Sequence, residues 1–320
     1  MSFRSLAFPG LAWLVPLALA AAPAEAAPEG KDSASKQAPA PAAQAEPRPA
    51  LWLLADDDTR IYMFGTIHVL PPGFRWRSAA LDRAVGEAAE LVVETYEAPG
   101  TEDLDDLSGL KGFFAEEAVP ILQRVPRKNR KALKAAIEAS GVPEPALDRM
   151  HSWAAAMTLG IAQMLNEYGV EDVSAAPGVE DVLEETFRGA GKPILSVEDG
   201  DAVLASLSAL PEAVQTELLL EAIAPPAGGG EGGETQLGVG EADWVAGRSE
   251  ALDLALEPGF PPALFDVLVR RRNAAWTAWL EERLKTPGTL LFAVGAGHLA
   301  GPESVQAMLA KRGLRVKRVD

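Results

Sequence analysis

The sequence contains no cysteine, only three histidines, and fewer basic than acidic residues (29 against 46). Without cysteine the chain forms no disulfide and carries no lipid on a thiol, and a metal site would need nitrogen and oxygen ligands. The formal net charge of −17 argues against sequence-independent binding to nucleic acid, whose phosphates would be repelled. With 320 residues, 48% of them hydrophobic, the chain is long enough to bury a full core.

The first 26 residues have the order of a secretory signal. Arg4 precedes an apolar run that ends at Ala22, and small residues follow at Ala24 and Ala26. We therefore expect a signal peptide over residues 1–26, cleaved after Ala26, and a periplasmic or secreted protein. The alternative is an uncleaved membrane anchor, which would be the protein's only membrane contact. The apolar run is short for a span and contains a proline, which disfavours this alternative.

The rest of the chain divides by composition. Residues 27–50 are rich in alanine and proline without apolar periodicity, which predicts a disordered linker. A single α/β domain is expected over residues 51–320, with a helical insertion at about 100–285 because several stretches there have helical periodicity. The glycine-rich segment 228–233 predicts a surface loop.

Strand and helix patterns alternate at both ends of this domain. "LWLLADDDTRIYMFG" predicts two strands joined by an Asp-rich turn, a helix follows from Ser78, and Leu91–Glu94 is a short apolar strand. Near the C-terminus "TLLFAVG", "PESVQAMLAKR" and "LRVKRV" repeat the order strand, helix, strand, and Lys192–Asp199 predicts one more strand. This order predicts an α/β fold with a mixed, largely parallel sheet and flanking helices.

Two of the predicted apolar strands end in the same motif, Gly-x-x-His. In "RIYMFGTIHVL" the pair is Gly65 and His68, and in "TLLFAVGAGHLAG" it is Gly295 and His298. The glycine supplies an unusual φ or a close backbone approach, so that the chain leaves the strand sharply. Glu94 ends a third predicted strand. Because functional groups in open α/β sheets collect beyond the carboxyl ends of the strands, we expect these three side chains to share one crevice.

Two imidazoles and a carboxylate are suitable ligands for Zn²⁺, Mn²⁺, Co²⁺ or Fe²⁺, with open positions for water that becomes a hydrolytic nucleophile. The same groups can also act without metal, one histidine serving as general base while the others orient it. The alternative is a structural role, in which each histidine ends a strand with its ring nitrogens hydrogen-bonded, and Glu94 caps a neighbouring group. His151, which opens a helix without the Gly-x-x-His motif, is expected to be structural or exposed.

The run "RRRN" (Arg270–Asn273) lies in a predicted helix just before the second Gly-x-x-His strand. Such a run usually forms a basic helix face that is exposed to solvent. Three consecutive arginines nevertheless cover more than half the helix circumference, so Arg272 or Asn273 can turn toward the crevice and bind a carboxylate or a metal-bound oxygen. The tryptophans of "DWVAG" and "NAAWTAWLEERL" are expected to pack in the core.

Several segments, taken in order, resemble the TraB/GumN family, which includes the animal Tiki metalloproteases. The resemblance covers Leu51–Asp320 and rests on the following stretches: "LWLLADDDTRIYMFGTIHVLPPG", "LVVE", "GVEDVLEETFRGAGKPILSVED", "DWVAG", "RRRNAAWTAWLEERLKTPGTLLFAVGAGHLAG" and "GLRVKRV". It implies an α/β core with a helical insertion, distantly similar to erythromycin-esterase-like and ChaN-like proteins.

The resemblance also implies a site that contains His68, Glu94, His298 and the pair Arg272 and Asn273. Gly65 and Gly295 match the motif glycines. Glu180 falls where the family often has an acidic residue, although capping of a helix N-terminus is the simpler interpretation. Because Tiki proteins are divalent-metal-dependent peptidases, the resemblance implies that His68, Glu94 and His298 bind Mn²⁺, Co²⁺ or Zn²⁺.

The expected function is that of an exported, metal-dependent hydrolase acting on a peptide or amide bond, with a peptide or small molecule as substrate. Glu94 would act as ligand or general base, and Arg272 and Asn273 would steady the substrate or the developing oxyanion. The alternative is a non-catalytic periplasmic protein that holds a metal or haem in the same crevice, as ChaN-like relatives suggest. No oligomeric state is predicted.

Overall fold

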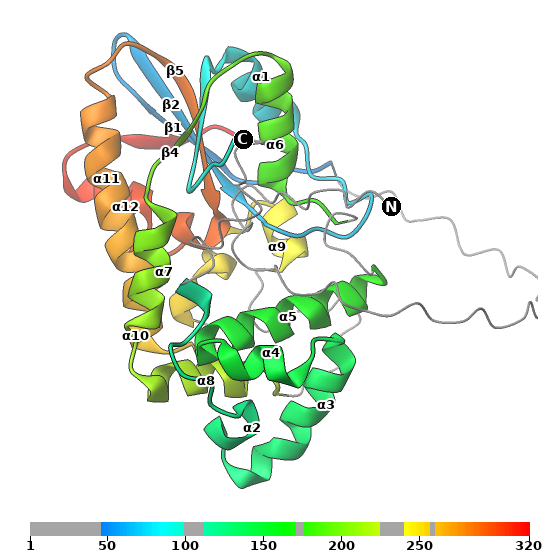
Figure 1. Cartoon of the computed structure of the whole chain (residues 1–320). Helices are drawn as coiled ribbons and strands as arrows, with labels where there is room; N and C mark the ends of the chain where they lie inside the picture. The colour runs from blue at the N-terminus through cyan, green and yellow to red at the C-terminus, as the bar shows by residue number, and fades with distance from the viewer. Residues whose placement is uncertain (1–45, 99–111, 171–175, 225–239, 257–259) are drawn as a thin grey trace, which may run out of the picture.

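The structure is a computed structural model that describes residues 46–98, 112–170, 176–224, 240–256 and 260–320 (Figure 1). The predicted signal peptide, most of the predicted linker and the glycine-rich loop 228–233 lie outside these residues. Within the described ranges no single helix has the length and apolar composition of a membrane span. Helices α7 (Gly200–Ser208) and α8 (Glu212–Ala222) have that length and composition only when they are taken together, and the two helices are bent by 98° relative to each other.

A six-stranded sheet forms the centre of the fold, in the order β4-β3-β5-β2-β1-β6. The strands are β1 (Leu51–Ala55), β2 (Thr59–Thr66), β3 (Glu90–Val93), β4 (Ile194–Ser196), β5 (Gly288–Gly295) and β6 (Val316–Arg318). The four strands β4, β3, β5 and β2 are parallel, whereas β1 pairs antiparallel with both β2 and β6. The predicted mixed, largely parallel α/β sheet is therefore confirmed.

The predicted hairpin at the start of the domain is formed by β1 and β2. Its Asp-rich turn closes because the Asp56 carboxylate accepts hydrogen bonds from the backbone N–H groups of Asp58 (3.2 Å) and Thr59 (2.8 Å). The predicted strand–helix–strand unit is β2, α1 (Ala79–Glu87) and β3, with Ser78 as N-cap. Strand β5, more than 190 residues later in sequence, lies between β2 and β3 and is parallel to both. The carboxyl ends of β2, β5 and β3 therefore lie side by side.

Helices cover both faces of the sheet, and the alternation of side chains decides which residues each face buries. On one face, α1 and α6 (Val179–Gly189) pack against a cluster that includes Phe64, Leu91 and Leu291. On the other face, α11 (Arg271–Arg283) and α12 (Val305–Lys311) pack against a cluster that includes Met63 and Phe292. Figure 1 shows these two helical layers on opposite sides of the strands.

A group of helices lies beyond the carboxyl ends of the strands and has a hydrophobic cluster of its own, which includes Trp153 and Leu219 (Figure 1). Its helices are α2 (Ile121–Arg124), α3 (Arg130–Ser140), α4 (Glu144–Arg149), α5 (Ser152–Tyr168), α7, α8 and α10 (Pro262–Phe265). Further short elements are α9 (Glu241–Val245), η2 (Arg127–Asn129), η4 (Ser249–Leu252), η5 (Leu254–Leu256) and η7 (Ala296–Leu299). The expected helical insertion at about 100–285 is thus interrupted by α6 and β4, and it ends before α11, because all three elements belong to the sheet and the layers that cover it.

The sequence from residue 261 to 285 predicts one helix, but the structure divides it. Helix α10 leads into a π-helical turn, η6 (Asp266–Arg270), and α11 follows without a gap. A π-helical turn holds one residue more than an α-helical turn, so it rotates the side chains that follow it. This rotation affects the residues Arg272 and Asn273 at the start of α11.

Candidate active site

Three strand ends bring His68, Glu94 and His298 to the same place. His68 lies two residues after β2, Glu94 directly follows β3, and His298 lies in η7, directly after β5. All three side chains surround the backbone of Gly295. A side-chain carbon placed on Gly295 would be 3.2 Å from Glu94 Oε1, 3.5 Å from His298 Cδ2 and 3.8 Å from His68 Nε2. The structure therefore brings the two histidines of the Gly-x-x-His motifs and the strand-end glutamate together.

The two motif glycines permit this approach through lack of a side chain, and neither has a positive φ. A Cβ on Gly65 would lie 2.9 Å from the α-carbon of Ala296, so this glycine lets the turn after β5 cross close to β2. Gly295 leaves room for Glu94, whose Oε1 accepts the Gly295 backbone N–H over 2.7 Å. Of the two roles expected for these glycines, close backbone approach is the one that applies.

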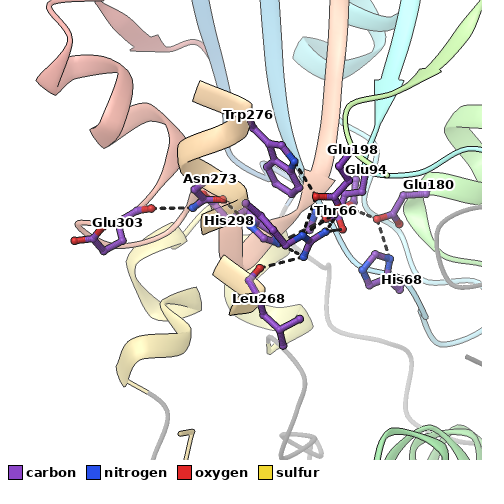
Figure 2. A network of polar contacts seen from close by, with 12 residues as sticks. Thr66, His68, Glu94, Glu180, Glu198, Leu268, Asn273, Trp276, His298 and Glu303 are labelled. Carbon is purple, nitrogen blue, oxygen red and sulfur yellow. Dashed lines mark hydrogen bonds and ion pairs between the residues drawn. The ribbon is translucent and has the colours of Figure 1, made fainter. Parts of the chain in front are cut away.

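Glu180, at the start of α6, holds the ring of His68 (Figure 2). Its buried Oε1 accepts the Nδ1–H of His68 over 2.9 Å and the hydroxyl of Thr66. Helix α6 comes this close because the Val179 N–H donates to the carbonyl of Ile67 over 2.9 Å. Glu180 does not cap the helix, because Asp181 accepts the N–H at the N-cap position. No described residue is hydrogen-bonded to Nε2 of His68, which faces a cavity.

Asn273 fixes the ring of His298. Its side-chain Nδ2 donates to the backbone carbonyls of His298 (3.1 Å) and Glu303 (2.8 Å), so Oδ1 must be the acceptor that lies 2.6 Å from His298 Nδ1. The Nδ1 atom of His298 therefore carries the proton, and Nε2 presents a lone pair. The Nε2 atom of His298 lies 3.1 Å from Nη1 of Arg272, which donates to this lone pair. Burial and the positive charge of Arg272 lower the pKa of His298 to about 3, so the ring is neutral.

Arg272 lies at the centre of the polar cluster. Its Nη2 pairs with both Glu94 Oε2 and Glu198 Oε1, and its Nε donates to both oxygens of Glu198 at 3.1 and 3.0 Å. Burial by itself lowers the pKa of Arg272, but the two carboxylates outweigh it and raise the pKa above its ordinary value. By contrast, Arg270 and Arg271 are exposed and pair with Asp266. The "RRRN" run thus supplies one largely buried cation, Arg272, and two arginines that face solvent.

Glu198 follows β4, the fourth parallel strand, and sequence patterns alone did not mark it. Its Oε2 accepts the indole N–H of Trp276 over 3.0 Å. The Trp276 ring, buried as expected for a core tryptophan, also lies 4.8 Å from the Arg272 guanidinium carbon and 4.4 Å from the ring centre of His298. The available signal was the position of Glu198, a carboxylate at the end of the predicted strand Lys192–Asp199.

The charges of His68 and Glu94 follow from these contacts. Burial lowers the pKa of His68, but the negative charge and hydrogen bond of Glu180 outweigh it and raise the pKa to about 9. Burial raises the pKa of Glu94, but Arg272, and then the two histidines, hold it well below its usual range. In the described arrangement His68 is an imidazolium, His298 is neutral and Glu94 is a carboxylate.

A cavity of about 380 Å³ opens onto this cluster. His68, Glu94, Arg272 and His298 line one end of it, and apolar side chains of α5 and α7 line the other. Its volume falls within the range of roughly 300–1,000 Å³ of pockets that enclose small ligands. Asn273 is fully buried behind His298, and His151, at the N-terminus of α5, is not among the lining residues.

The donor types fit a divalent ion, but their present contacts do not. His68 Nε2 and Glu94 Oε1 face the same space, whereas the lone pair of His298 Nε2 is occupied by the Arg272 guanidinium. A cation at that position would also lie beside the positive charge of Arg272. Within the described residues, no group of three or more His, Asp and Glu side chains has the arrangement of a metal site. As they lie, these residues do not form a three-ligand centre.

Comparison with known protein families finds a match over most of the chain. The model of the TraB/PrgY/gumN family matches residues 50–318. The chain belongs to the TraB/PrgY/gumN family. No curated protein and no solved structure matches it. In this TraB/PrgY/gumN-family protein, the matched region contains every strand of the sheet and all the polar residues described above.

Proposed function

We propose that this protein is an exported hydrolase that cleaves a peptide or amide bond. The observation that supports the proposal is the convergence of His68, Glu94 and His298 around Gly295, beside Arg272, at one end of a cavity. Convergent polar groups with perturbed pKa values in a cavity are the usual signature of a catalytic site.

Glu94 and His68 are the groups assigned to proton transfer. Oε1 of Glu94 takes a proton from a water molecule whose oxygen attacks the carbonyl carbon of the substrate. Nε2 of His68 donates its proton to the leaving nitrogen as the carbon–nitrogen bond breaks. Solvent then carries the proton from Glu94 back to His68. Glu180 supports this cycle because its hydrogen bond to Nδ1 keeps Nε2 pointed at the cavity.

Arg272 is assigned to holding Glu94 and His298 in place. Its five N–H groups are engaged by Glu94, Glu198, the Leu268 carbonyl and Nε2 of His298, so none is left for the carbonyl oxygen of the substrate. His298 and Asn273 act as positioning residues in this scheme, because they fix the orientation of the Arg272 Nη1 atom.

Dependence on Mn²⁺, Co²⁺ or Zn²⁺ is the second part of the proposal. It is supported by the resemblance to Tiki proteins and by the donor types of His68, Glu94 and His298. An ion bound by all three would require Arg272 to leave Nε2 of His298. The proton transfers above are therefore assigned to protein groups alone, and the dependence of cleavage on a metal ion is left to the experiment below.

The testing experiment measures peptide cleavage and metal content on one set of preparations. Wild type, His68→Ala and His298→Ala are compared before chelation, after chelation and after addition of Mn²⁺, Co²⁺ or Zn²⁺, with His151→Ala as the matched histidine control. We expect both site variants to lose cleavage while the His151→Ala variant keeps it, and chelation to abolish cleavage until an ion is restored.

Each other outcome removes a defined part of the proposal. Unchanged wild-type cleavage after chelation would show that no metal ion is required, and the protein would still be a hydrolase. Equal cleavage by wild type and both site variants would end the hydrolase assignment. A metal or chromophore that is retained through purification without any turnover would indicate the alternative, a periplasmic binding protein.

Export is tested separately by N-terminal sequencing of protein recovered from the periplasm or the medium. A chain that begins at Ala27 is expected from the small residues at Ala24 and Ala26. A membrane-bound chain that begins at Met1 would instead indicate an uncleaved anchor.

A further inference from the structure

The end of the cavity that faces away from the polar cluster is apolar, and one helix face supplies much of it. Met157, Ile161 and Met164 of α5 line this end, together with Leu204 and Leu207 of α7. The α5 residues are spaced four and three apart, which places them on one side of the helix. Figure 1 shows α5 crossing the space beyond the carboxyl ends of the strands.

These α5 side chains lie at the edge of the helical layer's core or outside it, since Met157 packs against the core from outside and Met164 packs against a separate small cluster. The residues of α5 that fill that core, among them Trp153, Ala155 and Leu159, are fully or almost fully buried. Met157, Ile161 and Met164 are instead half-buried. Among the described residues, Ile161 belongs to none of the hydrophobic clusters. An apolar helix face inside a cavity remains in contact with water until an apolar group covers it, and covering it is favourable.

The polar end of the same cavity favours a neutral group over an anion. Both cations at this end are already paired, Arg272 with the carboxylates of Glu94 and Glu198, and the His68 imidazolium with Glu180. A free carboxylate of a ligand would therefore approach two negative charges and find the nearby guanidinium occupied. The carbonyl of an amide or a peptide carries no charge and meets no such repulsion.

We infer that Met157, Ile161, Met164, Leu204 and Leu207 form a subsite for a large apolar group that is joined to a neutral amide carbonyl. This assignment rests on the proposed function and names the class of substrate that the same site takes. The apolar group is either an aliphatic or aromatic side chain of a peptide, next to the cleaved bond, or an acyl chain. In both cases the amide lies at His68 and Glu94 while the apolar group lies along α5.

Binding without turnover is measured first. Unbranched amides from acetamide to octanamide are titrated into wild type and into the inactive His68→Ala variant by calorimetry. Affinity is expected to rise by about threefold to fourfold for each CH₂ group until the subsite is filled, the factor that corresponds to about 0.8 kcal/mol. Octanoate is expected to bind more weakly than octanamide. An affinity that does not depend on chain length overturns the subsite.

Variants of Ile161 give the residue-level test. The Ile161→Phe variant shortens the available space, so the rise in affinity should stop at a shorter chain, and Ile161→Ala should weaken octanamide binding by about tenfold. Leu165→Ala is the matched control, because Leu165 lies on the same helix but does not line the cavity. Circular dichroism checks that each variant is folded. If both Ile161 variants bind the amide series as wild type does, the assignment is wrong.

Cleavage assays separate the two sources of the apolar group and keep the subsite distinct from the proposed function. Peptides with Ala, Leu, Phe or Asp beside the bond are compared with N-acetyl and N-octanoyl anilides. A preference of tenfold or more for Leu or Phe over Ala indicates a peptide side chain, and the same preference for the octanoyl anilide indicates an acyl chain. Binding that depends on chain length, without any cleavage, would support the subsite and contradict the hydrolase assignment. Cleavage without any preference among these substrates would contradict the subsite alone.

Discussion

The side-chain carbonyl of Asn273 accepts the Nδ1–H of His298 over 2.6 Å, and this hydrogen bond decides which ring nitrogen faces Arg272. Because Nδ1 carries the proton, Nε2 can accept from the Arg272 Nη1 atom at 3.1 Å. Asn273 is itself held by two backbone carbonyls, so its amide cannot turn without losing both bonds. One buried amide thereby sets the tautomer of a histidine and, through it, the position of the central arginine.

The Asn273→Asp variant tests this relationship with a nearly unchanged shape. A carboxylate beside Nδ1 favours the imidazolium form, so the pKa of His298 should rise from its value of about 3. The charged ring then donates at Nε2 toward Arg272 and repels it, and cleavage should fall on the order of tenfold to hundredfold. NMR titration of His298 and kcat/KM are the two readouts. An unchanged His298 pKa and unchanged kcat/KM would contradict the assigned role.

Glu180 should control the charge of His68. The Glu180→Gln variant removes the negative charge that outweighs burial, so the pKa of His68 should fall from about 9 to below 7. Cleavage at neutral pH should fall because His68 then lacks the proton that it donates to the leaving group. Glu185, an exposed residue five positions after Glu180 on α6, provides the control, and the Glu185→Gln variant should leave the His68 titration unchanged. A His68 pKa that stays near 9 in Glu180→Gln would show that another group raises it.

Arg272 should not be replaceable by lysine. The planar guanidinium contacts two carboxylates and a histidine ring at once, whereas an ammonium group cannot reproduce that geometry. The Arg272→Lys variant should therefore lose on the order of a hundredfold in kcat and also unfold at a lower temperature. The neighbouring Arg271→Lys variant is a matched control because Arg271 is exposed and contacts only Asp266 among the described residues. Equal loss in both variants would attribute the effect to helix α11 rather than to the site.

The motif glycines should respond differently to alanine. In Gly65→Ala the new methyl group would lie 2.9 Å from a backbone atom of Ala296, so the turn after β5 must shift and the free energy of unfolding should fall by about 1–3 kcal/mol. In Gly295→Ala the nearest atom is Glu94 Oε1 at 3.2 Å, at the end of a side chain that can move. This variant should stay folded and lose cleavage. Thermal unfolding and kcat/KM, measured on both, distinguish the two cases.

Strand ends were the part of the site that could be predicted from sequence. Apolar runs that stop at Gly-x-x-His and at Glu94 identify carboxyl ends of parallel strands, and parallel strands place those ends at one edge. The sequence does not reveal that β5 lies between β2 and β3, although this order is what brings His68 and His298 to the same glycine. Strand order depends on contacts across the whole fold, and local periodicity contains no information about it.

The contacts that the sequence could not predict depend on how the helices dock. Glu180 reaches His68 only because the start of α6 bonds to the backbone at Ile67. The choice of Arg272 over its two neighbours follows from the rotation of α11, which comes after the π-helical turn Asp266–Arg270. The sequence already named Arg272 and Asn273 as the residues able to face the crevice, whereas the π-helical turn that orients them appears only in the structure.

Glu184 provides a prediction about stability and pH. It lies one turn after Glu180 on α6, is fully buried, and neither carboxylate oxygen has a hydrogen-bond partner among the described residues. Arg188 is its nearest cation, at 3.9 Å. Burial and the nearby charges of Asp181 and Glu180 raise the pKa of Glu184 from 4.5 to about 9. The folded protein therefore holds a proton on Glu184 that the unfolded chain releases above pH 4.5.

Because the folded state binds this extra proton between about pH 4.5 and pH 9, the free energy of unfolding should decrease as pH rises through that window. The decrease should approach about 1.4 kcal/mol per pH unit, relative to a variant that lacks the carboxyl group. Glu184→Gln should thus be more stable than wild type at pH 8, with a difference that becomes small near pH 5. Denaturant unfolding at pH 5, 6.5 and 8 measures this, with Glu185→Gln as the exposed control. Parallel pH profiles for wild type and Glu184→Gln would mean that Glu184 ionises normally and finds a partner when charged.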